Sequence, residues 1–508
     1  MSLRTVGTFS IRAEAPEATP PRQALGRAAV GGVAWQGASY LLGKVSVLVT
    51  TIMLARILTP RDFGIVALAL VFIAYADVVT DLGVAQALVF LPADRRNNDA
   101  ALTISLLVSM GLVALAMPIA PLAARFFGRP DVTTLFRVMS LSLLLGAVGQ
   151  VPDALLRRDL RFRRRFVPTL ARSIGQGVVS IGLALAGLGP WSIVIGYLAG
   201  DAIYSGAAWI LVGYRPGPRF WRASALVLRP LLGYGVPAAA HALLVSLIFD
   251  VDYLIVGKLL GPVQLGYYTI GFRIPELVII NVFYVLSAVA FPVFSRTRHE
   301  PQRLRRAYLV SLRLQTTYGV GAGVAMAMIA PMLVHALLGA RWAASIVPLE
   351  ALALYAAFRS VGNSATDLYK GIGRPGLAMW LSLVRLVAVV PALWFAARFS
   401  IEWVSWTQAL LALVLALLMQ GVATRLLGIR WTVFARAMMP AVSVGFGAAV
   451  GAGLVRALVP GSELLRLILA VGAGAAGALA MVWWIDRSFV RETLGLVRRR
   501  PESQPESW

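Results

Sequence analysis

Residues 56–64 read RILTPRDFG, and residues 258–266 read KLLGPVQLG. The second stretch follows the first at an offset of 202 positions, with a cation, a proline and a glycine in the same register. Proline stops an incoming helix because it lacks a backbone N–H, and glycine frees the backbone where the next helix begins. Each stretch therefore predicts a turn between two helices, and the repetition predicts an internal duplication.

Long apolar segments flank both turns and recur along almost the whole chain. Of the 508 residues, 59% are hydrophobic and 14% are charged, whereas about a quarter are charged in a typical soluble protein. Runs of about 20 apolar residues cross a bilayer as helices. The sequence predicts an all-α polytopic membrane protein with about fourteen transmembrane helices, at residues 31–56, 64–90, 100–122, 134–156, 167–188, 191–213, 231–257, 266–292, 308–337, 346–370, 377–397, 403–425, 435–457 and 464–486.

The duplication covers six predicted helices, and an even number keeps both copies in the same orientation. A weaker echo follows at an offset of 213, where Arg157, Arg161 and Arg172 match Lys370, Arg374 and Arg385. We therefore predict two parallel six-helix lobes, related by an axis along the membrane normal, with a pathway between them. The predicted units are a disordered cytoplasmic tail at 1–28, a first lobe at 29–214, a second lobe at 215–428, two further helices at 429–487 and a cytoplasmic tail at 488–508.

The basic charge of the chain is explained by membrane topology. The formal net charge is +24, from 47 basic and 23 acidic residues. With both termini in the cytoplasm, 31 basic residues fall in inside segments and 9 in outside segments, as the positive-inside rule predicts. We expect a bacterial inner-membrane protein with cytoplasmic termini, no cleaved secretion signal and no nucleic-acid partner.

The composition argues against disulfide, thiolate, zinc and enzymatic chemistry. The chain has no cysteine and three histidines, so we predict no disulfide, no thiolate nucleophile and no zinc site. No predicted loop between spans is much longer than about twenty residues, which leaves little room for a water-exposed active site. We expect neither an enzyme nor a cofactor.

Seven basic residues fall within the predicted spans: Lys44, Arg137, Arg172, Arg273, Arg313, Arg359 and Arg385. A charge inside the membrane is costly and is a functional candidate. Arg137, Arg172 and Arg313 lie near span ends, from which long side chains reach the interface. Lys44 and Arg359 lie near the middle of their spans and are better candidates for a polar passage.

Acidic residues lie at matching depths. Asp77 is level with Lys44, and the pair Asp250 and Asp252 is level with Arg273 and Glu276. Such pairs either join adjacent helices, or break and reform as a cavity changes side, or provide an acid for a coupling cation or proton.

One histidine falls in the middle of a predicted span. His241 could titrate near neutral pH, or it could form a hydrogen bond between helices. Both readings stay open from the sequence.

Motifs spread over about residues 30–430 resemble the oligosaccharide flippases of the polysaccharide exporter (Wzx-type) family, within the multidrug/oligosaccharidyl-lipid/polysaccharide exporter superfamily. Their order and spacing carry the resemblance, and the last two helices are the least diagnostic part. The motifs are WQG at 35–37, LARILTPRDFG at 54–64, DLG at 81–83, RRDLRFR at 157–163, GPWS at 189–192, DYLIVGKLLG at 252–261, FPVFSR at 291–296 and GIGRP at 371–375.

The resemblance implies a V-shaped transporter whose central cationic cavity opens alternately to each face. It would accept an undecaprenyl-pyrophosphate-linked oligosaccharide in the cytoplasmic leaflet and release it in the periplasmic leaflet, for exopolysaccharide, capsule or O-antigen synthesis. Lys44 ranks first because span one of each lobe borders the cavity in this family, and Lys44 or Arg273 would contact the pyrophosphate. The substrate-binding candidates are Lys44, Arg273, Arg359, Asp77, Asp252 and His241.

The expected partners are the polyprenyl-pyrophosphate-linked oligosaccharide and membrane lipids, together with a polysaccharide polymerase and glycosyltransferases. We expect a monomer. The alternatives are a multidrug or small-cation exporter of the same superfamily and, less favoured, a membrane glycan polymerase or ligase.

Overall fold

The computed structural model describes residues 42–81, 88, 94–130, 132–159, 162–217, 243, 246–247 and 250–485. Regular structure in these residues is helical throughout, and no strand occurs among them. Eleven helices of the described part are long and apolar enough to cross a membrane. Many large apolar side chains are exposed, such as Ile210 at 83%, as expected where helices face lipid. The predicted all-α polytopic membrane fold is confirmed.

The first lobe consists of seven described helical segments. They are residues 42–57, α2 (Pro60–Asp81), α4 (Arg95–Phe127), α5 (Val132–Met139), α6 (Leu141–Arg158), α7 (Phe162–Leu185) and α8 (Pro190–Val212). α4 shows how its sequence sets the bounds: the Asp94 side chain accepts a hydrogen bond from the Arg96 N–H, and Gly128 ends the helix with φ 65°. Both are common helix-capping arrangements.

The second lobe follows in the same order. Its described segments are residues 250–259, α10 (Gly261–Pro275), η1 (Glu276–Ile280), α11 (Asn281–Thr297), α12 (Pro301–Leu333), η2 (Val334–Leu338), η3 (Ala340–Ser345), α13 (Ile346–Gly371), α14 (Pro375–Ala396) and α15 (Ile401–Leu427). Two further helices complete the chain, α16 (Trp431–Leu458) and α17 (Glu463–Ile485).

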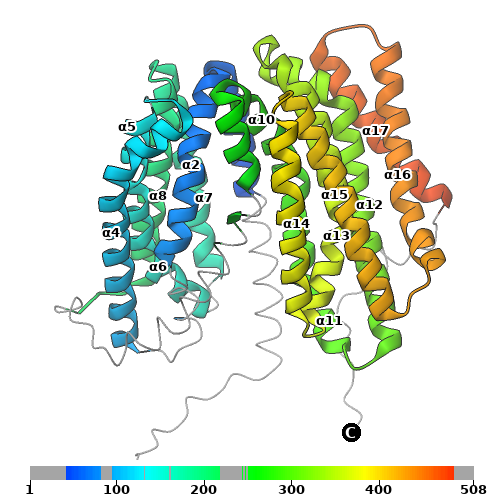
Figure 1. Cartoon of the computed structure of the whole chain (residues 1–508), viewed down its shortest axis with the longest axis horizontal. Helices are drawn as coiled ribbons and strands as arrows, with labels where there is room; N and C mark the ends of the chain where they lie inside the picture. Colours follow the sequence, from blue (N-terminus) through cyan, green and yellow to red (C-terminus); the bar gives the residue numbers. More distant parts are fainter. Residues whose placement is uncertain are drawn as a thin grey trace, which may run out of the picture.

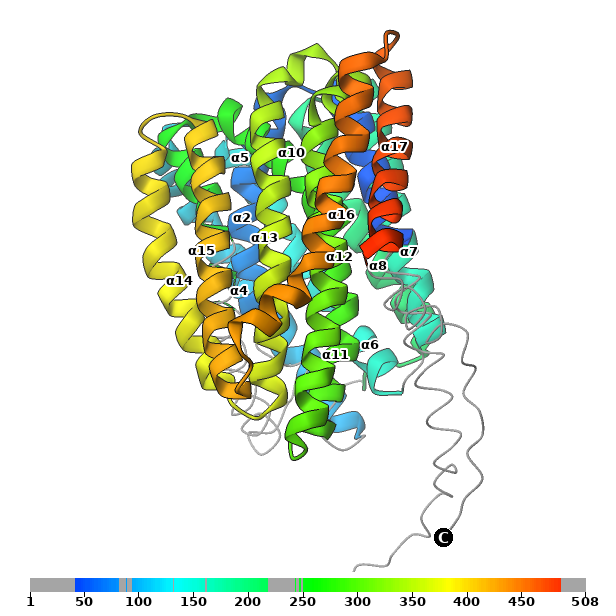
Figure 2. The same cartoon turned by 90° about the vertical axis from the view of Figure 1, so that its right-hand side faces the viewer.

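The two lobes lie side by side, and α10 packs against both α2 and α13 (Figure 1). α16 and α17 cover one side of the second lobe along α12 (Figure 2). Gly447 of α16 meets Gly477 of α17 so closely that a β-carbon on either would overlap the backbone of the other. Gly447 and Gly477 therefore allow close packing of α16 on α17.

Two predicted spans are interrupted. The span predicted at 134–156 is divided into α5 and α6 at Ser140, whose hydroxyl donates to the carbonyl of Arg137 at 2.6 Å. The span predicted at 266–292 contains the π-helical turn η1, directly after Pro275. Pro275 cannot donate a backbone hydrogen bond, so the helix is free to widen by one residue there. Hydropathy does not detect such breaks because they change hydrogen-bond register, not polarity.

Candidate functional site

A cavity of about 590 Å³ lies between the two lobes. Its wall includes residues of the 42–57 segment, α2, α7 and α8 from the first lobe, and of α10 and η1 from the second. A cavity of this volume is large enough for a drug-sized ligand, and so for one part of a larger molecule.

Four charged residues line the cavity: Asp77 of α2, Asp250, Arg273 of α10 and Glu276 of η1. Arg273 and Glu276 form an ion pair, with Nη1 and Oε2 3.1 Å apart, and both side chains are partly exposed. The pair lies where α10 passes into the π-helical turn η1. Glu276 follows Arg273 by three residues, so both side chains lie on one face of the helix. The described wall is therefore mixed in charge, with three carboxylates and one guanidinium.

Lys44 and Asp77, which the sequence places at one depth, each lie within electrostatic range of further charged residues. Lys44 is half-buried in the 42–57 segment, and the charges of Glu276 and Arg273 act on it. Asp77 instead lies within electrostatic range of Arg172 and Asp201 in its own lobe. The structure thus brings Lys44 to the second lobe's ion pair, across the lobe boundary.

Asp252 lies in the core of the second lobe, only 1% exposed. Its carboxylate accepts hydrogen bonds from the Tyr268 hydroxyl at 2.7 Å, from Gln408 Nε2 at 3.3 Å and from the Tyr253 N–H at 2.9 Å. Asp250, two residues earlier, faces the cavity. Of these two aspartates, Asp250 therefore lies in the cavity wall.

Arg359 also lies within the second lobe. Its Nη1 donates to the Tyr355 hydroxyl at 3.0 Å, and Arg385 Nη2 donates to the same hydroxyl at 2.9 Å. Neither arginine belongs to the cavity wall. The candidate His241 lies outside the described residues.

Arg172 differs from its predicted position. α7 begins at Phe162, so Arg172 lies ten residues inside the helix and not near its end. Its Nη2 is 2.5 Å from Asp201 Oδ1, and its guanidinium lies over the rings of Tyr197 and Tyr204. Arg172 is therefore partly exposed and paired with a carboxylate of α8, an ion pair that the sequence does not predict.

The two repeated turns meet at one end of the cavity. A β-carbon on Gly64 would overlap the carbonyl of Pro262, and a β-carbon on Gly266 would overlap the carbonyl of Pro60. The proline of each copy thus packs on the glycine of the other, as expected for two copies related by a two-fold axis. We call this contact, with the residues that flank it, the turn seal.

The repeated cations extend the turn seal. Arg56 donates through Nε to the carbonyl of Leu337 at 2.5 Å and through Nη2 to that of Ala336, at the end of η2. Lys258 donates to the carbonyl of Phe126, at the end of α4, and lies 4.3 Å from its ring centroid. Each cation therefore binds the C-terminal carbonyls of a helix in the opposite lobe, where the helix dipole favours positive charge.

A tryptophan and an arginine complete the turn seal. Trp342 is fully buried, donates through Nε1 to the carbonyl of Ala55 at 2.7 Å, and packs edge-on against Phe63. Arg341 Nη1 donates to the carbonyl of Leu58 at 3.2 Å. Both contacts cross between the lobes, so this end of the cavity is closed.

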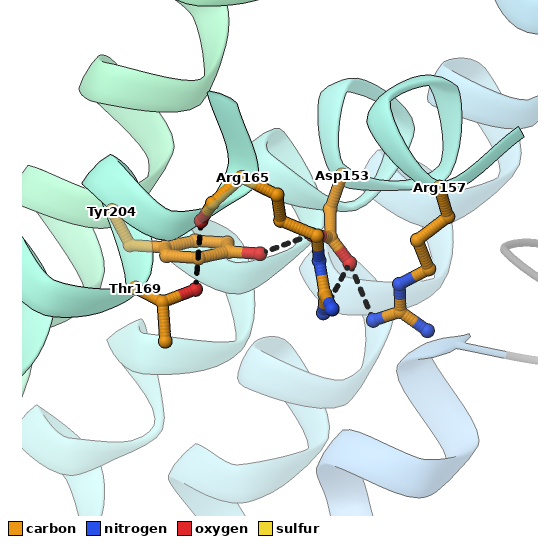
Figure 3. Close-up of polar contacts among 5 residues, drawn as sticks. All are labelled: Asp153, Arg157, Arg165, Thr169 and Tyr204. Carbon is orange, nitrogen blue, oxygen red and sulfur yellow. Dashed lines mark hydrogen bonds and ion pairs between the residues drawn. The ribbon is translucent and has the colours of Figure 1, made fainter. Parts of the chain in front are cut away.

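The opposite end of the first lobe holds a second charged cluster (Figure 3). Asp153 of α6 accepts from Arg165 Nε and from the Tyr204 hydroxyl, each at 2.5 Å, and also pairs with Arg157. These contacts join α6, α7 and α8. Arg157 and Arg165, on either side of the junction between α6 and α7, are thus held by one buried carboxylate.

The segment after α8 is anchored nearby. The Tyr214 hydroxyl donates to Asp99, and the Gly217 N–H donates to the same carboxylate at 3.2 Å. Burial, followed by the hydrogen bond to Asp99, raises the pKa of Tyr214. The chain therefore leaves the first lobe from a fixed point on α4.

Sequence reasoning missed three groups of residues. It did not single out Asp153 or Asp201, and it matched Arg56 with Lys258 in the duplicated turn without assigning either a contact. The register of the two cations within the duplication was the available signal for the turn seal. Among the described residues no group of three or more His, Cys, Asp or Glu could hold a metal ion.

Residues 53–347 match the family described as polysaccharide biosynthesis protein, over more than half of the chain. The chain belongs to this family. The chain is 26% identical to the succinoglycan biosynthesis transport protein ExoT of Rhizobium meliloti (strain 1021), over 90% of this chain and 93% of that protein. It is 23% identical to the lipopolysaccharide biosynthesis protein WzxC of Escherichia coli (strain K12), over 72% and 74%.

The fold of this family member is also found among solved structures. The lipid II flippase MurJ in an inward closed conformation superimposes with a TM-score of 0.73, at 13% sequence identity, over 91% of this chain and 100% of that one. At this identity the likeness establishes the fold. The family that the sequence motifs indicate is confirmed by the family match and by the curated relatives.

Proposed function

We propose that this protein moves an undecaprenyl-pyrophosphate-linked oligosaccharide from the cytoplasmic to the periplasmic leaflet of the bacterial inner membrane. The product would feed exopolysaccharide, capsule or O-antigen assembly. Support comes from family membership and from the transport and polysaccharide functions that the names of ExoT and WzxC state. The polymerase and glycosyltransferases that make and use the glycan would be its functional partners, and the protein itself would act as a monomer and not as an enzyme.

The turn seal is the observation that carries the mechanism. It closes one end of a cavity that lies between two similarly oriented lobes. Alternating access requires a cavity closed at one face while it opens at the other. With both termini cytoplasmic, as the positive-inside rule favours, the turn seal lies at the periplasmic face. Substrate would enter from the cytoplasm and leave when the seal opens.

The pyrophosphate needs cations inside the membrane. Arg273 lies in the cavity wall, and Lys44 stands beside the pair that Arg273 forms with Glu276. We assign the pyrophosphate contact to these two side chains, with Asp77 in the same wall. Arg359 and Asp252 would act from the core of the second lobe, and His241 stays a cavity candidate that would either titrate near neutral pH or form a hydrogen bond between helices.

Each predicted unit would have one part in this mechanism. The two lobes, at 29–214 and 215–428, would move, and the helical pair at 429–487 would be an addition to the second lobe. The remaining units are the tails at 1–28 and 488–508. The lobes would rock against each other about the cavity. The added pair, α16 and α17, packs on α12 and would move with the second lobe.

The proposal is tested by deleting the gene and following the lipid-linked intermediates. We expect the finished oligosaccharide to accumulate in the cytoplasmic leaflet, and wild-type protein to restore its transfer. The variant Lys44→Ala/Arg273→Ala should fail to restore transfer at normal membrane levels, whereas Arg398→Ala, an exposed cation outside the cavity, should restore it. Normal translocation in the deletion strain would contradict the proposal.

A second function is favoured by the carboxylates of the cavity. Three acidic side chains in the wall would attract a cationic drug, as in a multidrug or small-cation exporter. Cation-dependent drug efflux without any change in surface glycan would favour that reading. A membrane polymerase or ligase would instead change glycan length while the lipid-linked unit still crosses the membrane.

A further inference from the structure

Tyr355 of α13 holds two arginines at one hydroxyl oxygen. Arg359 Nη1 donates to this oxygen at 3.0 Å from the next turn of α13, and Arg385 Nη2 donates to it at 2.9 Å from α14. The tyrosine is only 3% exposed. A hydroxyl oxygen has two lone pairs, and both are used here. One neutral oxygen therefore joins α13 to α14 and keeps two positive charges close together inside the second lobe.

Tyr355 also contacts the wall of the cavity. Its ring packs on that of Phe272, with the centroids 6.0 Å apart. Phe272 lines the cavity and directly precedes Arg273 in the chain. Phe272 also stacks on Tyr268, whose hydroxyl donates to the buried carboxylate of Asp252. A change at the cavity wall can therefore reach Tyr355 through one aromatic contact.

Carboxylates lie on either side of the two arginines. The charge of Glu276 in the cavity wall acts on Arg359, and the charge of Arg385 acts on Asp252. Glu276 itself pairs with Arg273 at 3.1 Å. These groups form a series that runs from the cavity wall to α14. We call it the charge chain, and its members are Arg273, Glu276, Arg359, Tyr355, Arg385 and Asp252.

The helix at the far end of the charge chain has little buried surface. Of the described spans, α14 and α17 are the least buried, and Val387, two residues after Arg385, is 72% exposed. The turn before α14 contains Gly373 with φ 78°, a conformation that glycine adopts without strain. Hinge positions are often small residues at the end of an element. α14 can therefore shift about this turn with a small loss of packing.

We propose that Tyr355 is a positioning residue that transmits the occupancy of the cavity to α14. The inference rests on the proposed function, in which Arg273 and Lys44 bind the pyrophosphate. When they do so, Glu276 loses the partner that it has in this structure. A carboxylate binds a guanidinium more strongly than a neutral hydroxyl does. Arg359 should therefore turn from Tyr355 to Glu276.

The turn of Arg359 changes how α14 is held. Tyr355 keeps the guanidinium of Arg385, and the repulsion between two like charges at one oxygen is relieved. Arg385 can then approach the hydroxyl, and α14 follows it toward α13. An anion in the cavity would thus cause a helix shift within the second lobe, in addition to any movement of one lobe against the other. Helix shifts of about 1–2 Å are typical of such transitions.

The test measures a distance within the second lobe of the full-length protein. The natural chain has no cysteine, so spin labels attach only at introduced positions. Val387→Cys labels α14, and Val442→Cys labels α16 on the far side of the lobe (Figure 1); both native side chains are exposed. Double electron–electron resonance gives the distance between the labels with and without undecaprenyl pyrophosphate. Rocking of a rigid lobe leaves this distance unchanged, whereas the charge chain predicts that it shortens by about 2 Å.

Tyr355→Phe keeps the ring against Phe272 and removes the oxygen. The lipid should then no longer change the distance, and translocation at saturating lipid should fall about fivefold to tenfold. The lipid concentration that half-saturates binding should stay near the wild-type value, because Tyr355 does not touch the lipid. The matched control is Tyr369→Phe, which removes another buried hydroxyl of α13, one that donates to the carbonyl of Met419. This control should keep the shift.

A second variant tests the charge chain at the cavity and does not depend on the folding of Tyr355→Phe. Glu276→Gln replaces the carboxylate by a neutral amide, which attracts the guanidinium of Arg359 less strongly. It should bind undecaprenyl pyrophosphate and lose the shift in distance. Glu402→Gln removes an exposed carboxylate outside the cavity and should keep the shift.

The outcomes separate the inference from the function on which it rests. Lipid that binds to the wild-type protein without changing the distance between the labels would overturn the inference and leave the flippase intact. A shift that persists in Tyr355→Phe or in Glu276→Gln would overturn the charge chain. Wild-type protein that does not bind undecaprenyl pyrophosphate would instead overturn the proposed function itself.

Discussion

The two copies of the repeated turn share one contact and differ in how each is held. In both, proline packs on the glycine of the other copy. In the first copy, the Asp62 carboxylate accepts from the Thr59 N–H at 2.9 Å and from its hydroxyl at 2.7 Å. In the second copy, the corresponding positions are Gly261, with φ 81°, and Gln264. The first turn is therefore capped by its own side chains, and the second is not.

This difference indicates unequal roles in opening the turn seal. Thr59 and Asp62, with Pro60 between them, form a capping box that fixes the start of α2. The second turn instead depends on Gly261, whose backbone is in the left-handed region. Glycine has no side chain to restrict its backbone angles. We infer that the first turn stays rigid during transport and that the second absorbs the change in backbone angles, as hinge positions do.

The largest expected effect comes from breaking what the two turns share. Gly64→Ala and Gly266→Ala should each push the turns apart, lowering stability by about 1–3 kcal/mol as overpacking does, and should reduce glycan-lipid translocation by about tenfold or more. Stability is measured by thermal unfolding in detergent, and translocation by complementation of the deletion strain.

Gly111→Ala is the matched control, because a β-carbon there meets open space. The close contact between the turns would be refuted if both seal variants behaved like this control.

A smaller effect should separate the two cations. Arg56→Ala removes two hydrogen bonds to helix-end carbonyls and should cost about 1 kcal/mol, whereas Lys258→Ala removes one and should cost about half as much. Arg56→Lys should restore part of the loss. Thermal unfolding of the three variants gives the order of their stabilities. A larger loss of stability for Lys258→Ala than for Arg56→Ala would contradict the prediction.

The smallest effect tests the capping difference itself. Asp62→Ala should lower stability by about 1 kcal/mol because the capping box is lost. Gln264→Ala should change it by no more than about 0.5 kcal/mol, since its buried Oε1 has no hydrogen-bond partner among the described residues. Equal losses in denaturant unfolding would show that the turns are held alike.

Much of the fold could be predicted from the sequence because it depends on hydropathy and repetition. The apolar runs predict the helices, and the offset of 202 residues predicts two parallel lobes whose turns correspond. The sequence TPRD at 59–62 also carries a capping signal that would place the start of α2 at Pro60 and not at residue 64. That signal lies in side-chain hydrogen bonding, which a hydropathy window averages away.

The cavity was harder to predict because depth along a helix does not fix which face a side chain occupies. Lys44 and Asp77 lie at one depth, and in addition Lys44 lies near Arg273 and Glu276, and Asp77 lies near Arg172. Asp250 and Asp252 differ by two residues, which turns them to different sides of a helix. Their surroundings follow from how the lobes are rotated and packed, which no local pattern encodes.

The central claim is that the turn seal must open for the glycan lipid to leave. The natural chain has no cysteine, so Ile57→Cys/Arg341→Cys introduces the sole reactive thiols, across the seal where Arg341 reaches the carbonyl of Ile57. A reducible bifunctional maleimide should join them, stop translocation of the lipid-linked oligosaccharide, and permit it again after reduction, while the single variants stay active. Undiminished translocation by the fully cross-linked protein would contradict the account.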